Sequence, residues 1–257
     1  MSESDGPFSL EVLADGRTCG QRAAAQGGRL VQAALEARGR AAVVLATGAS
    51  QFEMLAALGS LPSVAWDRVT FFHLDEYLGL PVSHPASFRR YLWERFHARL
   101  PVPPRAFHYL DGEAVDPVAE CRRVGALIAE DSVDVAFIGI GENGHLAFND
   151  PPADFEVTDP YIVVTLDEAC RWQQAGEGWF PSLEDVPRRA ISMSIRQILR
   201  SRHLVVTVPD LRKATAVRAS LEGPITPSVP ASILRRHPSC RLFLDVESAS
   251  LLSIVPP

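Results

Sequence analysis

The stretch VDVAFIGIGENGH, residues 133–145, passes directly from a strand-length apolar run into a glycine-rich turn. Other runs of the same kind are rich in Val, Ile, Leu and Phe and lack a regular polar alternation, which is typical of strands buried on both faces of a parallel sheet. Seven such runs predict strands at residues 41–47, 69–75, 133–141, 161–167, 190–195, 203–209 and 241–246.

Helical patterns separate several of these runs. Apolar residues at helical spacing predict helices at residues 18–38, 50–58, 117–131 and 212–221. Strands that alternate with helices indicate an α/β fold, with a doubly wound, mostly parallel, Rossmann-like sheet. We find no linker or repeat, so we expect residues 1–257 to form a single domain. In such sheets, ligands bind beyond the carboxyl ends of the strands.

Composition narrows the class of protein. The 257 residues carry a net charge of -6, which gives no general attraction to nucleic acid or to an anionic membrane. The four cysteines show no CxxC spacing and indicate buried thiols. The chain begins without a signal-peptide pattern and has no membrane-length apolar run, so we expect a cytoplasmic protein. Among 25 basic residues only Lys213 is lysine, which reflects either chance or a required ammonium.

Three turns at predicted strand ends carry chemically suggestive residues. The first turn contains Thr47, Gly48, Ala49 and Ser50 and leads into a helix. Small residues let a ligand approach the backbone, and a helix N-terminus favours an anion. The alternative is an ordinary strand-to-helix turn in which Ser50 caps the helix.

The second turn places Asp75 and Glu76 side by side at the end of a hydrophobic strand. Adjacent residues of a strand point to opposite faces, so one carboxylate can face a site while the other has a structural role. A pair of solvated turn acids is the alternative.

The third turn, residues 139–144, contains a GxGxxG pattern, but we reject a dinucleotide site. That motif needs a helix that starts at its third glycine, and Pro151 and Pro152 would stop such a helix within two turns. A tight loop that presents Asn143, His145 and Asp150 is the better interpretation, with His145 as a candidate general base.

A metal site is a weaker hypothesis. His145, Asp150 and Asp154 could in principle hold a divalent ion, but the chain has no HExxH motif and no cysteine ligand pair. We therefore expect no metal and no cofactor.

Four motifs in order give the chain a family resemblance: LATGAS (45–50), FFHLDEYLGLPVSHPASF (71–88), GIGENGHLAFNDP (139–151) and VPDLRKATAVRASLEGP (208–224). From about residue 8 to residue 250 it resembles the glucosamine-6-phosphate deaminase/isomerase family, which shares its fold with 6-phosphogluconolactonases. GHLAFNDP and DEYLGLP resemble the deaminases more than the lactonases.

The resemblance implies roles for individual residues. Asp75 corresponds to the acid that moves a proton between C2 and C1 of the sugar, and His145 to the ring-opening group. The loop from Thr47 to Ser50 and the single Lys213 correspond to the phosphate site. We also expect Glu76 and Gly144 at the substrate, and Asn143 and Asp150 beside His145.

Several positions depart from the family pattern. Asn143 stands where many members have Asp, and Asp150 stands where they usually have Glu, so the contact between His145 and its carboxylate could require a water or a shifted loop. The phosphate-binding Arg expected before an aromatic pair is replaced by the sequence QQAGEGWF at 173–180, which leaves Arg171 or Arg212 as substitutes. Ile162 and Val164 replace basic effector-site residues, so we expect no allosteric activation.

The resemblance therefore implies a cofactor-free enzyme that converts glucosamine 6-phosphate and water to fructose 6-phosphate and ammonia. The expected partner is a small-molecule sugar phosphate, and the expected assembly is a monomer or small homo-oligomer. Two alternatives remain open. One is a lactonase or an isomerase for another sugar phosphate, and the other is a non-catalytic sugar-phosphate sensor.

Overall fold

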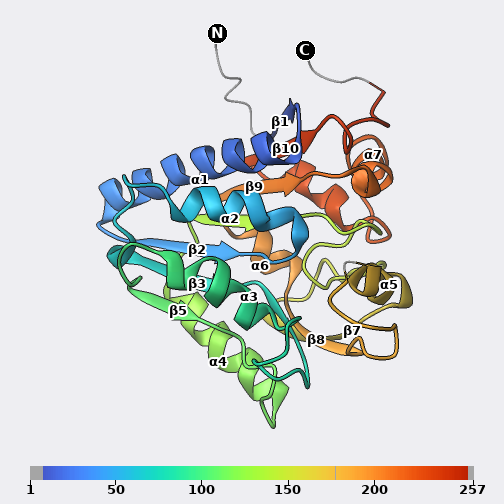
Figure 1. Ribbon diagram of the computed structural model, residues 1–257, viewed down its shortest axis with the longest axis horizontal. Coiled ribbons are helices and arrows are strands. Elements are labelled where there is room, and N and C mark those ends of the chain that lie inside the picture. The colour runs from blue at the N-terminus through green and yellow to red at the C-terminus, as the bar shows by residue number, and fades with distance from the viewer. Residues whose placement is uncertain (1–7, 177, 254–257) are drawn as a thin grey trace.

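A seven-stranded parallel sheet forms the centre of the protein in a computed structural model that describes residues 8–176 and 178–253 (Figure 1). Its strand order is β1-β10-β9-β6-β2-β3-β5. The strands are β1 (Phe8–Leu13), β2 (Ala41–Leu45), β3 (Val69–His73), β5 (Ala106–His108), β6 (Val135–Ile138), β9 (His203–Val208) and β10 (Cys240–Asp245).

Helices cover both faces of this sheet. They are α1 (Gly16–Arg38), α2 (Phe52–Gly59), α3 (Phe88–Arg95), α4 (Pro117–Glu130), α5 (Glu168–Gly176), α6 (Ile195–Leu199) and α7 (Ala214–Glu222). Figure 1 shows α1 and α2 running together across one side of the sheet. The predicted helices at 18–38, 50–58, 117–131 and 212–221 correspond to α1, α2, α4 and α7 within a few residues, so these four predictions are confirmed.

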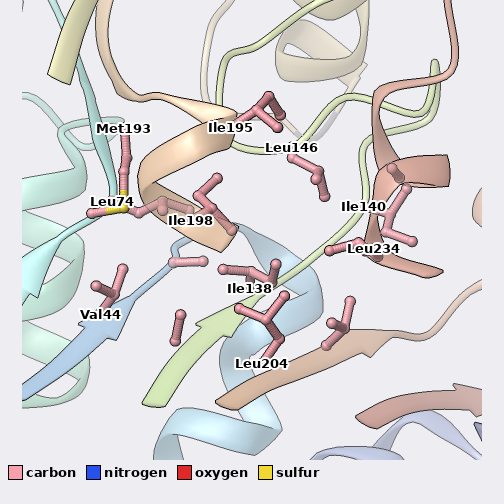
Figure 2. Close-up of a cluster of buried hydrophobic side chains, with 14 of the residues drawn as sticks. Val44, Leu74, Ile138, Ile140, Leu146, Met193, Ile195, Ile198, Leu204 and Leu234 are labelled. Atoms are coloured by element: carbon pink, nitrogen blue, oxygen red, sulfur yellow. The ribbon is translucent and has the colours of Figure 1, made fainter. Parts of the chain in front are cut away.

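The side chains of the central strands alternate between two apolar clusters. In β2, Val43 and Leu45 pack in the cluster under α1 and α2, whereas Ala42 and Val44 pack in the cluster on the opposite face. Figure 2 shows this second cluster, where Val44, Ile138 and Leu204 of three strands meet side chains of α6. Both faces of the strands are therefore buried, which explains why these runs lack polar alternation.

Two of the seven predicted strands lie outside the parallel sheet. β7 (Tyr161–Thr165) and β8 (Arg189–Met193) pair antiparallel with each other, and β8 pairs antiparallel with the short β4 (Asp75–Tyr77). β8 is buried on both faces although it is antiparallel, because Ile191 packs against the large cluster and Ala190 against a smaller aromatic one. An apolar run alone thus did not reveal which sheet the strand joins.

The order of the parallel strands reverses at the centre of the sheet. From β2 the chain continues outward through β3 and β5, and then crosses to β6 on the other side of β2. The turns that follow β2 and β6 are therefore neighbours at the point where ligands bind in doubly wound folds.

No helix of the described residues is long and apolar enough to cross a membrane.

Candidate active site

A cavity opens at this reversal point, beyond the carboxyl ends of β2, β3, β6 and β9. It encloses about 510 Å³ of empty space, a volume that includes its open mouth. The lining residues are Ala46, Thr47, Gly48, Ser50, Leu74, Asp75, Phe88, Gly139, Ile140, Gly141, His145, Ala147, Phe148, Gln173, Gln174 and Lys213.

Asp75 lies at the cavity wall at the start of β4, where the chain leaves β3 and enters the small sheet. Its side chain is buried, and Oδ1 has no hydrogen-bond partner among the described residues. Burial, with a further contribution from the charge of Glu76, raises the pKa of Asp75 to about 8. Asp75 can thus exchange a proton near neutral pH, as an acid–base catalyst must.

Glu76 points away from the cavity, as expected for the neighbour of Asp75 on a strand. Its fully buried carboxylate accepts hydrogen bonds from the backbone N–H groups of Tyr77, Phe88 and Arg89 and from the hydroxyl of Ser87. Glu76 thus fastens the start of α3 to β4. The structure does not support the expectation that Glu76 contacts the substrate.

His145 lies at the end of a tight loop, residues 139–145, rather than in a helix. No helix occurs between β6 and β7, all of which the structure describes, so the prediction of a loop here instead of a helix is confirmed. A Cβ atom at Gly141 would lie only 2.3 Å from Nε2 of His145, so glycine lets the imidazole ring pack directly on the loop backbone.

Asp150 orients the ring of His145. Nδ1 of His145 lies 3.1 Å from Oδ1 of Asp150, so the shorter carboxylate reaches ion-pair distance of the ring, although Nδ1 makes no hydrogen bond among the described residues. Burial alone would raise the pKa of Asp150. The adjacent His145, with N–H donors from Asp167 and Asn143, holds that pKa below its usual value. An ionised Asp150 at Nδ1 leaves Nε2 as the nitrogen for proton transfer.

Asn143 supports the loop rather than the ring. Its Oδ1 accepts a hydrogen bond from the backbone N–H of His145 at 3.1 Å, and its Nδ2 donates to Asp150 at 3.2 Å and to Asp167 at 3.3 Å. The expected action of Asn143 on the imidazole is therefore indirect, through Asp150.

The opposite wall of the cavity suits an anion. Gly48 has a φ of 99°, a conformation that favours glycine, and its carbonyl accepts a hydrogen bond from Tyr91 of α3 at 2.8 Å. Ser50 does not cap α2. Its Oγ accepts a hydrogen bond from Nε2 of Gln51 at 3.1 Å, which leaves the hydroxyl proton for a ligand. With the N-terminus of the helical segment that begins at Ala49, this wall offers donors and partial positive charge.

Lys213 supplies the cation of this wall. It follows β9, its side chain is buried, and it is the only Lys or Arg among the described residues that line the cavity. Arg212 instead pairs with Asp210 at 2.8 Å, and Arg171 donates to the carbonyls of Leu183 and Val186. Neither arginine lines this cavity, although Arg212 lines a neighbouring groove that shares Ser50 and Lys213 with it.

Two expected substrate residues lie beside the cavity rather than at its wall. Ala49 lines a neighbouring groove, and Gly144 accepts a hydrogen bond from the backbone of Ala231. Conversely, Gln173 and Gln174 line the cavity although no sequence motif indicated them as site residues. Both lie in residues 173–180, where the family resemblance led us to expect an arginine, and neutral amides carry no comparable signal.

One group among the described residues has the spacing to hold a metal ion: His145, Asp150 and Cys170 offer ligand atoms within 4.8 Å of one another. Asp154 is not part of it, because its carboxylate accepts hydrogen bonds from the backbone N–H groups of Glu156 and Val157. Burial, followed by the charges of Asp150 and Asp167, raises the pKa of the Cys170 thiol far above its usual value, which disfavours the thiolate that a metal needs.

Asp75 and His145, two groups able to transfer protons, thus face one cavity together with a wall suited to an anion, at the reversal point of a parallel sheet. This arrangement defines a class: an α/β enzyme site for a small phosphorylated substrate. A family model described as glucosamine-6-phosphate isomerases/6-phosphogluconolactonase matches residues 14–242. The chain belongs to this family.

Individual relatives agree with this membership. The chain is 35% identical over 212 residues to a glucosamine-6-phosphate deaminase of Halothermothrix orenii, covering 81% of this chain and 86% of the relative. It is 36% identical over 211 residues to glucosamine-6-phosphate deaminase 1 of Bacillus subtilis, covering 80% and 86%.

Solved structures show the same fold. A monomeric glucosamine-6-phosphate deaminase superposes with a TM-score of 0.86 at 33% identity, covering 95% of this chain and 99% of that one. A 6-phosphogluconolactonase of Thermotoga maritima superposes with a TM-score of 0.76 at 19% identity, covering 93% and 99%. The second likeness concerns the fold alone.

Proposed function

We propose that this chain isomerises and deaminates glucosamine 6-phosphate, giving fructose 6-phosphate and ammonia, without a cofactor. The observation that carries the proposal is the cavity, where Asp75 and the His145–Asp150 pair share one space with Lys213. Relatives named glucosamine-6-phosphate deaminase, at 35% and 36% identity, support the same reaction. We further propose that the protein acts in the cytoplasm as a monomer or small homo-oligomer.

The phosphate binds first at the wall formed by Thr47, Gly48, Ser50 and Lys213. Nε2 of His145, whose ring lies beside the Asp150 carboxylate, takes the proton of the anomeric hydroxyl O1 and returns it to the ring oxygen O5, so that the C1–O5 bond breaks and C1 becomes an aldehyde. The sugar then lies extended between the anion-binding wall and Asp75.

Proton transfer follows at C2. Asp75, as the carboxylate, removes the C2 proton, the electron pair forms the C1–C2 double bond, and the carbonyl oxygen at C1 takes a proton as its π bond breaks, which gives an enolamine. Protonation at C1 gives an imine at C2, and addition of water there releases ammonia and leaves the ketone of fructose 6-phosphate. The substrate is neither oxidised nor reduced, so water is the only co-reactant that the reaction requires.

The test is release of ammonia and fructose 6-phosphate from glucosamine 6-phosphate by EDTA-treated protein, with Asp75→Asn as the matched variant. Asparagine keeps the shape of the side chain but cannot accept the proton, so we expect at least about a 100-fold loss of kcat. Wild-type turnover in this variant would contradict the role of Asp75.

The same assay separates the alternatives. A lactonase would hydrolyse 6-phosphogluconolactone without releasing ammonia from the amino sugar. A sensor would show a thermal shift with glucosamine 6-phosphate and no turnover. Either result would replace the proposed function.

A further inference from the structure

Two adjacent glutamines of α5 line the cavity, and each is fixed by its side-chain oxygen. Oε1 of Gln174 accepts a hydrogen bond from the hydroxyl of Tyr77 at 2.6 Å. Oε1 of Gln173 accepts one from the backbone N–H of Glu142 at 2.8 Å. α5 is therefore tied both to β4, which carries Asp75, and to the loop that carries His145.

The bond from Tyr77 sets the orientation of the Gln174 amide. Because Oε1 accepts the hydrogen bond from Tyr77, the NH2 group must lie on the opposite side of the planar amide. Within the described residues, 8–176 and 178–253, Nε2 of Gln174 donates to no protein group, and the residue lies at the cavity wall. A buried wall thus offers a pre-oriented, neutral donor to whatever fills the cavity.

The position and the lack of charge of the Gln174 NH2 group indicate which kind of ligand atom it binds. Tyr77 lies two residues beyond Asp75 on the same short strand, whereas the anion-binding wall is built by Thr47, Ser50 and Lys213 from other elements. No hydrogen bond among the described residues ties Gln174 to the wall of Lys213, whereas the bond to Tyr77 ties it to the strand of Asp75. A neutral amide suits an uncharged oxygen there and adds no positive charge beside Asp75, whose burial holds its pKa near 8.

We propose that Gln174, oriented by Tyr77, is a specificity residue that donates a hydrogen bond to a hydroxyl oxygen on the carbon chain of the sugar, not to its phosphate. The proposal rests on the proposed function, because it deepens the recognition of the same substrate. It predicts that Gln174 distinguishes a sugar phosphate from phosphate alone.

The test measures binding by calorimetry, with glucosamine 6-phosphate and inorganic phosphate as the two probes. The Asp75→Asn protein prevents turnover during titration. We expect Gln174→Met to weaken binding of glucosamine 6-phosphate about 3- to 10-fold, the effect of one lost hydrogen bond, while the Kd of inorganic phosphate stays unchanged. Gln32→Met is the matched control, because that glutamine bonds the carbonyl of Ser63, away from the cavity.

A second variant keeps the test decisive if Gln174→Met fails to fold. Tyr77→Phe keeps the NH2 group but releases the amide, and it should weaken the same probe about 2- to 3-fold without affecting inorganic phosphate. An equal loss of affinity for both probes would assign Gln174 to the phosphate site. An unchanged affinity for glucosamine 6-phosphate would show that Gln174 does not contribute to binding of the sugar. Failure of the proposed function would appear instead as absence of ammonia release by the wild-type enzyme, which these binding data do not measure.

Discussion

Burial of Asp75 decides its chemistry. A carboxyl that ionises near pH 8 is mostly protonated at pH 7, and the base in the proposed reaction is the ionised form. Activity that depends on this form must rise with pH until the group is ionised.

We therefore expect kcat/KM to increase with pH through a limb near pH 8. Glu76 contributes to the raised pKa of Asp75, so Glu76→Gln should move this limb to lower pH. The measurement is the pH profile of ammonia release, corrected for the separately titrated amine of the substrate. Glu94→Gln, which removes an exposed carboxylate paired with Arg90, is the control and should not shift it. A limb that stays in place in Glu76→Gln would contradict the electrostatic coupling.

The same burial destabilises the fold at alkaline pH. The carboxyl of Asp75 ionises near pH 4 in the unfolded chain but near pH 8 in the folded protein. Between these values the folded state holds a proton that the unfolded state has lost, so the free energy of unfolding falls as pH rises through this window. Above pH 8 both states are ionised, and the penalty reaches its full value.

Asp75→Asn should remove this penalty. We expect the variant to gain stability over wild type progressively between pH 5 and pH 9, by up to about 5 kcal/mol at the alkaline end. Chemical denaturation at a series of pH values measures it. A difference that is independent of pH, or that shrinks as pH rises, would refute the buried-carboxylate interpretation.

The role of Lys213 can be tested against its sequence neighbour Arg212, which serves as a matched control. Lys213→Met removes the cavity cation and should raise KM for the sugar phosphate about 10- to 100-fold, with a smaller change in kcat, since phosphate does not react. Arg212→Met removes a cation that pairs with Asp210 outside the cavity and should leave KM nearly unchanged. The reverse pattern in steady-state kinetics would assign the phosphate to Arg212.

Sequence patterns predicted residues of strong chemical character better than neutral ones. Asp75, His145 and Lys213 follow apolar strands and carry charge or a titratable ring, so their positions at strand ends could be inferred, and the cavity brings them together. Gln174 gave no such signal, because its role depends on a hydroxyl 97 residues away, on Tyr77. The sequence pattern predicts opposite faces for Asp75 and Glu76, but the bonds from α3 that hold the Glu76 carboxylate away from the cavity depend on the fold.

Among elements, α3 stabilises the site from behind. Its Tyr91 donates to the carbonyl of Gly48, and Glu76 fixes its first turn to β4. The helix thus connects the anion-binding turn with the strand of Asp75. This 8-residue helix was not predicted from the sequence, although α2, of equal length, was.

Tyr91→Phe tests this connection. Loss of the hydroxyl frees the Gly48 carbonyl and loosens the turn, so we expect KM to rise about 2- to 10-fold with little change in kcat. Tyr109→Phe is the control, because its hydroxyl contacts His97 away from the cavity. Unchanged KM in Tyr91→Phe, or equal effects in both variants, would show that the turn holds its shape without α3.

The predicted strands include five of the seven strands of the parallel sheet, and miss β5 and β1, whose residues are all half-buried. The runs that became β2, β3, β6, β9 and β10 are enclosed by helices on both faces, as their composition predicted. β8 has the same apolar composition because the large cluster and the smaller aromatic cluster enclose it. β5 has only 3 residues and is too short to be recognised from its sequence. Pairing partners are set by contacts distant in sequence, which a local pattern does not contain.

At the scale of the whole molecule, the two sheets share one core. Ile191 and Met193 of β8 lie in the same apolar cluster as Val44 and Ile138 of the parallel sheet, a region that Figure 2 shows around Met193. A sheet that shares its core with its neighbour gains little stability alone, since unfolding either one exposes apolar surface on both. This shared cluster supports the proposal of a single domain.

We therefore expect one cooperative unfolding transition in which far-UV circular dichroism and tryptophan fluorescence coincide. The four tryptophans sample different regions: Trp66 is buried in the α1–α2 cluster, and Trp179 packs against the aromatic cluster of the small sheet. Ile191→Ala removes fully buried atoms from β8 and should destabilise the whole protein by about 2–5 kcal/mol, shifting both probes together. Val82→Ala, at an exposed position, is the control and should shift neither. An early transition in one probe of the Ile191 variant would show instead that the small sheet unfolds on its own and that Asp75 and Gln174 sit at the junction of two separable units.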